Sequence, residues 1–514
     1  MRNKLTINKI LKVIFLVVCS ALPFLSCKAP APPYKGLGKP MIVAGTAKLT
    51  GTIKAPNAIV KDGAIVTVAV SHQISGEFVK YKAVVDQSGN FSLNADVEAN
   101  LSFGNFSTSL NPGRYILLKL NSEEATHIDI TYNSSAEIES ITGIPGMSQH
   151  DILRATDLIG RMIEFPQVKE EPLYNSKPED FLNSAKANLI ERLAVVESDS
   201  LLSDELKGVL TDDFRLLFYN GALFDYDKAM HANYSITNGD KNKKPVIQKV
   251  DRSYYRFLKD LKLNDPKYLY AYGSFWEFQR RLLQNEVLAI PPIAEVDIPT
   301  WLAGTKEILA DLLGFNDGLY YDILAASAYG RQLTEELRPF SEKQKGNITS
   351  YWGNGAIAKI LFRKNEQVAK LDKLKSPVVI NDVASIAVDK IIETILSKHK
   401  GKVVLVDFWA TWCGPCLDAM QRFRNTKAEY YGKDVVFVYL TNRSSPRKLW
   451  EEKVKGIGNE HYYLDDNQWT YLMKQFGFEY IPSYLLYNKN GVLNNKFTAF
   501  PENEAVKKMI DGLL

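Results

Sequence analysis

Cysteine and histidine are rare in this chain, which holds only four cysteines and six histidines in 514 residues. Cys19 and Cys27 fall in an apolar N-terminal segment, so Cys413 and Cys416 are the only cysteines beyond it. A fold built on several disulfides is therefore excluded. A structural zinc site takes four ligands, and the sequence offers neither a second cysteine pair nor histidines at ligand spacing. We therefore expect no metal at Cys413 and Cys416.

The chain also lacks an excess of charge of either sign. Its formal net charge is +4, and residues 1–26 contribute Arg2, Lys4, Lys9 and Lys12 without any acidic residue. These four charges account for the whole excess, so the remaining chain is formally neutral. Because proteins bind nucleic acids chiefly through basic surfaces, we expect no nucleic-acid partner.

A long apolar run is missing as well. The apolar part of residues 1–26 is shorter than the ~20 residues that a membrane-spanning helix needs. A basic start, a short apolar run and small final residues are typical of a secretory signal peptide. The end of the run, Phe24-Leu25-Ser26-Cys27, resembles a bacterial lipobox, with Phe24 where leucine is usual. The resemblance implies cleavage before Cys27 and lipid attachment to its thiol; a plain signal peptide or a retained anchor are the alternatives.

A lipid on Cys27 would hold the protein at a membrane surface of the cell envelope. Residues 27–44 are rich in proline and glycine, which predicts a tether between this anchor and the first domain. The tether lacks the acidic cluster that resembles surface-export signals. We therefore expect a lipoprotein that faces the periplasm, in the outer membrane.

Three regions with different patterns follow the tether, and together they predict a multidomain protein. Residues 45–140 contain short segments of β-branched and aromatic residues separated by turns, which predicts an antiparallel β-sandwich. Residues 141–373 show helical periodicity, which predicts an all-α middle domain. In residues 374–514 strands alternate with helices, which predicts an α/β fold around a central sheet.

Aromatic residues gather at helical spacing in the middle region. They are Tyr268, Tyr270, Tyr272, Phe275, Trp276 and Phe278. Packing in the core between helices is the favoured interpretation. A surface that binds a glycan or a peptide remains the alternative.

In the last region the apolar run at 403–410 predicts a buried strand that leads into Cys413. Cys413 would stand at the N-terminus of a helix, where free N–H groups and the helix dipole favour a thiolate. Cys416 lies one turn further, close enough to close a disulfide. Pro415 fits the first helical turn, and Gly414 leaves room for a substrate backbone. These features predict thiol–disulfide exchange with Cys413 as the attacking thiol.

Asp407 lies in the middle of the same apolar run. A buried carboxylate without a partner is costly, so we expect burial to raise the pKa of Asp407. The alternative is an exposed aspartate at the strand's end.

The segment VDFWATWCGPC resembles the active-site segment of the thioredoxin superfamily. The region 374–514 resembles the membrane-anchored TlpA/ResA-like thiol–disulfide oxidoreductases. The β-rich region resembles domains that precede thioredoxin-like modules in lipoproteins of Bacteroides-like bacteria. These resemblances imply a C-terminal thioredoxin-like fold and reduction of protein disulfides through Cys413 and Cys416. They imply no cofactor beyond this redox-active pair, and they require an unidentified electron donor.

The resemblance also implies roles for neighbouring residues. Asp407 would lie under the cysteine pair and help to move the proton of Cys416. Ile481-Pro482 matches the cis-proline that packs against the cysteines and presents a backbone edge to substrate. Trp412 would shield the disulfide, and Trp409 would pack beside it.

One position departs from the TlpA-like pattern. Many members carry a glutamate three residues after the second cysteine, followed by Met-Pro, where this chain has Ala419, Met420 and Gln421. Asp418, one residue earlier, would face elsewhere on the helix. Any role of that glutamate is therefore in doubt here.

Two functions remain open at this point. The first is an anchored thiol–disulfide oxidoreductase that reduces protein disulfides. The alternative is a binding or interaction lipoprotein in which residues 45–373 engage a partner and the redox domain serves as a sensing or accessory part.

Overall fold

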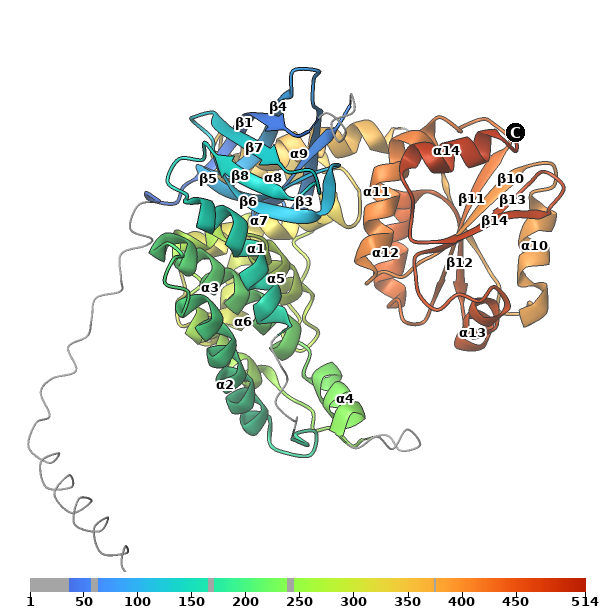
Figure 1. The fold of residues 1–514 in the computed structure, drawn as a ribbon. Coiled ribbons are helices and arrows are strands. Elements are labelled where there is room, and N and C mark those ends of the chain that lie inside the picture. The colour runs from blue at the N-terminus through green and yellow to red at the C-terminus, as the bar shows by residue number, and fades with distance from the viewer. Residues whose placement is uncertain (1–36, 57–62, 165–170, 238–244, 374–375) are drawn as a thin grey trace, which may run out of the picture.

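The computed structural model describes residues 37–56, 63–164, 171–237, 245–373 and 376–514. The predicted signal peptide, Cys27 and most of the predicted tether lie outside these residues. Figure 1 shows a β-rich region, a set of helices beneath it and an α/β domain beside both. Among the described residues, none of the helices is long and apolar enough to cross a membrane.

The β-rich region consists of two four-stranded sheets, with strand orders β4-β1-β7-β8 and β3-β2-β5-β6. The strands are β1 (Ile42–Lys54), β2 (Ile65–His72), β3 (Glu77–Val84), β4 (Asn90–Ala99), β5 (Leu101–Thr108), β6 (Asn111–Asn121), β7 (Thr126–Tyr132) and β8 (Ile138–Thr142). Apolar side chains from both sheets, such as Leu49 and Phe106, form one core. The predicted β-rich region is thus confirmed, although β1 begins inside the predicted tether.

The prediction of a wholly antiparallel arrangement is wrong at one pair of strands. β1 and β7 run parallel, with Leu49 opposite Thr126. Parallel neighbours need a crossover connection. Here the chain leaves the first sheet after β4, forms β5 and β6 in the second sheet, and returns as β7 in the direction of β1.

The middle region is helical, as predicted. Its α-helices are α1 (Gln149–Ile163), α2 (Pro178–Glu197), α3 (Asp204–Phe218), α4 (Tyr226–Thr237), α5 (Ser274–Gln284), α6 (Ile298–Leu313), α7 (Leu319–Thr334), α8 (Glu342–Trp352) and α9 (Ala356–Asp372). Their core is continuous with one side of the β-rich region, because Phe103 and Leu117 belong to the same apolar cluster as the helices.

The aromatic cluster of the middle region belongs mainly to this core. Tyr268, Tyr270, Phe275 and Phe278 are buried. Tyr268 and Tyr270 lie in a 3₁₀ turn before α5 rather than in an α-helix. Core packing, the favoured interpretation, therefore explains these four side chains.

The α/β domain has one six-stranded sheet with the order β14-β13-β10-β11-β12-β9. Its elements are β9 (Val378–Asn381), α10 (Ile391–Lys398), β10 (Val403–Phe408), α11 (Gly414–Ala428), β11 (Val435–Asn442), α12 (Arg447–Ile457), β12 (Asn459–Leu464), α13 (Asp466–Gln475), β13 (Ser483–Tyr487), β14 (Leu493–Thr498) and α14 (Asn503–Asp511). Helices α11, α12 and α14 pack on one face, and α10 and α13 pack on the other. This arrangement buries β10 completely and brings its C-terminal end to the start of α11.

A buried ion cluster joins the α/β domain to the helices. Lys453 of α12 is only 2% exposed, and its Nζ lies 3.6 Å from a carboxylate oxygen of Glu335. Arg331 and Arg280 also approach Glu335, and the three cations hold its pKa at about 2 despite burial. Nearby, a Cβ added to Gly456 would lie 1.8 Å from a backbone oxygen at Glu336. Close contact and paired charges thus fix α12 against the helical region.

Candidate active site

The cysteine pair lies at the start of helix α11, after the loop that follows strand β10. Cys413 is the N-cap residue of α11, and Pro415 lies in the first turn. Cys413 and Cys416 form a disulfide with their Cα atoms 5.3 Å apart. The backbone N–H of Cys416 donates to Sγ of Cys413 at 3.2 Å. The first turn therefore directs hydrogen-bond donors at the sulfur that the sequence predicts as the attacking thiol.

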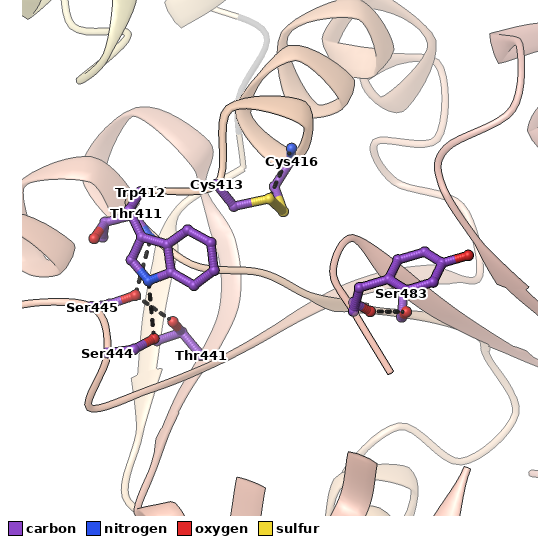
Figure 2. The surroundings of a disulfide bond; sticks show 9 residues. Thr411, Trp412, Cys413, Cys416, Thr441, Ser444, Ser445 and Ser483 are labelled. Carbon is purple, nitrogen blue, oxygen red and sulfur yellow. Dashed lines mark hydrogen bonds between the residues drawn. A yellow bond between two sulfur atoms is a disulfide. The ribbon is translucent and has the colours of Figure 1, made fainter. Parts of the chain in front are cut away.

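Hydrogen bonds from the β11–α12 connection hold the loop before Cys413 (Figure 2). The N–H of Thr411 donates to Oγ of Ser445 at 2.9 Å. The indole N–H of Trp412 donates to Oγ of Ser444 at 3.1 Å. Trp412 is 62% exposed, whereas Cys413 is 3% exposed and Cys416 is fully buried. Cys416 is therefore closed off from solvent, and Cys413 is the cysteine of the pair that keeps some accessible surface.

The Ile481-Pro482 peptide bond is cis, as the resemblance implies. The next residue, Ser483, pairs with Phe408 at the end of β10, and Figure 2 shows the disulfide between Trp412 and Ser483. The carbonyl of Pro482 accepts a hydrogen bond from the N–H of Ala499 at 3.0 Å. The structure thus brings Pro482 and Ile481 to the cysteine pair from a distant part of the sequence.

Asp407 lies in β10 beneath this arrangement and is only 6% exposed. Within the described structure its Oδ1 has no hydrogen-bond partner. Burial raises the pKa of Asp407 well above its usual range, and the charge of Lys427 opposes the rise. The alternative of an exposed aspartate is therefore wrong. A buried carboxyl group with a raised pKa can give or take a proton during exchange.

A small cavity of about 20 Å³ opens beside Asp407. Lys427, Tyr439, Tyr484 and Ala419 contribute to its lining. Sequence reasoning missed the first three residues. A signal for Lys427 exists, because Cys416, Met420, Phe423 and Lys427 follow one another at helical spacing on the inner side of α11.

Lys427 is held in place by polar contacts. Its Nζ donates to the hydroxyl of Tyr439 at 3.2 Å and to the carbonyl of Ile457 at 2.7 Å. Burial and the charge of Arg424 lower the pKa of Lys427 to about 7, and the charge of Asp407 opposes the change. Asp407 and Lys427 are therefore two titratable groups whose pKa values the site shifts toward each other.

The position that departs from the TlpA-like pattern faces the same cavity. Ala419 lines it, whereas Gln421 is exposed on α11. Asp418 is also exposed and pairs with Arg422 at 2.9 Å. The cavity therefore receives a lysine from further along α11 and no second carboxyl group from this turn.

The part of the chain that the structure describes holds no candidate metal site. Nowhere in it do three or more side chains of histidine, cysteine, aspartate or glutamate lie close enough together to hold a metal ion. His461 is buried, its Nε2–H donates to the carbonyl of Gly458 at 2.9 Å, and burial lowers its pKa to about 3. It is a neutral core residue that stacks on Tyr439.

Comparison with known proteins agrees with this geometry. The family described as Redoxin matches residues 382–512. Thiol-disulfide oxidoreductase ResA of Geobacillus thermodenitrificans is 26% identical over 118 residues, which cover 23% of this chain and 67% of that protein. Thioredoxin 2 of Chlorobaculum tepidum is 30% identical over 111 residues, which cover 22% of this chain and 79% of that protein. The chain spans 67% and 63% of the first two curated relatives that it matches.

Two solved structures are also similar over the same share of the chain. The thioredoxin domain of a thiol-disulfide oxidoreductase from Bacteroides vulgatus is 19% identical, with a TM-score of 0.21, over 22% of this chain and 84% of that chain. The exposed lipoprotein thioredoxin of Streptococcus pneumoniae is 25% identical, with a TM-score of 0.20, over 23% of this chain and 90% of that chain.

The match to thioredoxin 2 covers most of that protein at 30% identity, and the Redoxin match falls on the α/β domain. The thioredoxin-like fold expected for the C-terminal region is thereby confirmed. The chain belongs to the thioredoxin superfamily and carries a domain of the thiol–disulfide oxidoreductase type.

Proposed function

We propose that this protein is a membrane-anchored, periplasmic thiol–disulfide oxidoreductase that reduces disulfides in other proteins. The observation that carries the proposal is the Cys413–Cys416 disulfide at the start of α11, between Trp412 and the cis-proline and above buried Asp407. The lipobox at Cys27 supports the anchor and the location. Similarity to ResA and to thioredoxins supports the reaction type.

The reaction starts from the reduced pair. The thiolate of Cys413 attacks one sulfur of a substrate disulfide, the substrate S–S bond breaks, and the other substrate sulfur leaves as a thiolate. A mixed disulfide now joins Cys413 to the substrate. Cys416 then attacks Sγ of Cys413, and the second substrate sulfur leaves. Two electrons have passed to the substrate, and the protein holds the disulfide seen in the structure.

The surrounding residues would serve these two steps. The N-terminal turn of α11 stabilises the thiolate of Cys413. Asp407 would accept the proton of Cys416 before Cys416 attacks. Trp412, Ile481 and Pro482 would border the bound substrate, and exposed Gly414 and Pro415 leave its approach open.

The residues between the cysteines support the proposed direction of electron flow. A Gly-Pro pair resembles thioredoxin, with a potential of about −270 mV, rather than strong oxidants near about −120 mV. A reductase in an oxidising compartment needs an electron donor, so a membrane or periplasmic dithiol protein would return the pair to its reduced form. A measured potential of about −270 mV would support this direction; about −120 mV would identify an oxidant instead.

Two variants test the cysteine roles on insulin as the substrate. Cys416→Ser should accumulate a mixed disulfide with insulin, visible on a non-reducing gel, because the second attack is missing. Cys413→Ser should give neither the mixed disulfide nor catalysed reduction. Insulin reduction by Cys413→Ser at the wild-type rate would refute the proposed function.

The anchor needs a separate test. In a Gram-negative host, Cys27→Ser should move the protein from the membrane fraction to the soluble periplasmic fraction. Retention of Cys27→Ser in the membrane fraction after a high-salt wash would contradict lipid attachment at this residue.

A further inference from the structure

A groove of about 640 Å³ separates strand β3 from helix α11. Six successive residues of β3, Glu77 to Lys82, line one wall. The other wall includes Gln421 and Arg422 of α11, the helix that begins at Cys413. The groove lies within the ~300–1,000 Å³ range of ligand sites, and α11, which lines it, begins next to Cys413.

The wall formed by β3 is a free strand edge. β3 is the last strand of its sheet and pairs only with β2. The N–H of Val85, just after β3, donates to the carbonyl of Ala64, just before β2, at 2.8 Å. Along an antiparallel strand, the backbone N–H and C=O groups of successive residues point alternately toward one neighbouring strand and away from it. The backbone groups of every second residue before Val85 therefore also point toward β2. Those of the residues between them point away from the sheet.

Three of the outward-facing residues, Phe78, Lys80 and Lys82, line the groove. Among the described residues, no backbone hydrogen bond joins their outward N–H and C=O groups to another element. Together these residues span five positions of extended chain, or about 14 Å. Free donors and acceptors at this spacing match the main chain of one added strand.

The charge of the groove favours the same occupant. Five basic and five acidic side chains line it, so it is formally neutral. Arg422 pairs with Asp418 at 2.9 Å, and Arg363 pairs with Asp96 at 3.1 Å. Lys364 pairs with Glu77. A neutral, internally paired lining offers no attraction for a phosphate or nucleotide, whereas a polypeptide backbone carries no charge.

We propose that the edge of β3 binds an extended segment of a disulfide-bearing polypeptide as an added strand. The segment would lie in the groove beside α11, so that its disulfide reaches Cys413. This inference deepens the proposed function by naming the substrate class as unfolded or extended protein. Lysines on an edge strand also discourage pairing between copies of a protein.

Binding is tested with oxidised full-length protein and fluorescein-labelled, reduced and carboxymethylated α-lactalbumin. This probe is unfolded and has no disulfide, so its binding does not depend on redox activity. Lys80→Pro removes one outward N–H without removing a bond to β2. Fluorescence anisotropy should show about five- to tenfold weaker binding, as expected for one lost main-chain hydrogen bond.

Two controls separate this effect from damage to the strand. Val84→Pro removes an N–H of the same outward set but lies outside the groove lining, so it should bind the probe as the wild type does. Lys80→Thr keeps the N–H and should do the same. Equal binding by Lys80→Pro and the wild type would overturn the proposal, and so would equal losses in both proline variants.

Hydrogen exchange tests the same edge without any substitution. Saturating carboxymethylated α-lactalbumin should slow amide exchange in residues 77–84 of the wild type, because their outward N–H groups gain partners. Unchanged exchange in this segment would overturn the proposal. Failure of the proposed function would give a different result from failure of this proposal. The probe would still bind and protect β3, but Cys413 would not reduce insulin.

Discussion

The ammonium group of Lys427 lies 3.2 Å from the hydroxyl oxygen of Tyr439, and Tyr439 pairs across the sheet with Asp407. A lysine from the redox helix thus stands next to the buried carboxyl group that lies beneath the disulfide. Its positive charge lowers the pKa of Asp407, against the larger effect of burial. The readiness of Asp407 to lose its proton therefore depends on a residue eleven positions after Cys416.

Lys427→Met tests this dependence. Loss of the positive charge should raise the pKa of Asp407 further, so fewer molecules carry the ionised carboxylate at neutral pH. We expect insulin reduction at pH 7 to fall about three- to tenfold, with a smaller deficit at higher pH, because proton transfer contributes to the rate. The measurement is the pH profile of kcat/KM. Lys433→Met is the control. It removes an exposed lysine in the connection between α11 and β11 and should leave the pH profile unchanged.

Asp407→Asn should stabilise the oxidised protein, and more so as pH rises. The folded state raises the pKa of Asp407, so folding retains a proton that the unfolded chain releases above its own pKa of about 4. The contribution of protonated Asp407 to the free energy of unfolding is therefore fully present below that pH and is lost as pH rises toward the folded pKa. We expect a gain of about 1–3 kcal/mol at pH 8 and a smaller gain at pH 4, measured by guanidinium unfolding. A gain that is equal at both pH values would contradict this account.

Ser445→Ala should weaken the loop that carries the cysteines. Ser445 is buried, accepts a hydrogen bond from the N–H of Thr411 and shares one with Thr441. Alanine would leave the buried N–H of Thr411 without its partner, which costs about 1–3 kcal/mol of unfolding free energy. Ser444→Ala is the matched control, because its partner Trp412 is exposed and can bond to water; we expect a loss below about 0.5 kcal/mol. Similar losses in both variants would count against the prediction.

Replacement of glycine by alanine should have opposite effects on thermal stability at two helical positions, Gly456 and Gly346. Gly456→Ala would place a Cβ 1.8 Å from a backbone oxygen at Glu336, so α12 must shift away from the helical region. Gly346→Ala in α8 would meet nothing within 4 Å and should stabilise by about 0.5–1 kcal/mol. Thermal unfolding should show a lower Tm for Gly456→Ala and a higher Tm for Gly346→Ala. Small-angle scattering should show a larger radius of gyration for Gly456→Ala alone.

The sequence predicts the parts of the site that lie close together in the chain. Asp407, Cys413 and Cys416 belong to one strand–loop–helix segment. Helix geometry predicts the roles of the two cysteines, whereas the role of Asp407 is implied by the resemblance. The cis bond before Pro482 cannot be derived from local residues, because trans is the usual state of such bonds. Lys427 was missed because lysines on helices are normally solvated, although its spacing from Phe423 places it on the inner face.

Two strands of the α/β domain, β9 and β12, have weak local signals in the sequence. β9 is a four-residue edge strand with a single partner, β12. The sequence of β12 is mostly polar and aromatic, which is a weak signal for a strand. Its pairing with β11 and β9 stabilises it in the sheet. The parallel pairing of β1 with β7 and the groove between β3 and α11 depend on segments far apart in sequence. Such features come from tertiary packing, which periodicity does not describe.

Burial of Cys416 has a kinetic consequence. Every protein that exchanges with the pair must form its bond to Cys413, because Cys416 has no accessible surface. Under the proposed function, substrate and electron donor would therefore occupy the same sulfur in turn and could not be bound there together. Turnover would then be a double-displacement cycle in which each half-reaction regenerates the form that the other requires. High concentrations of oxidised donor should then slow substrate reduction by competing for the reduced protein.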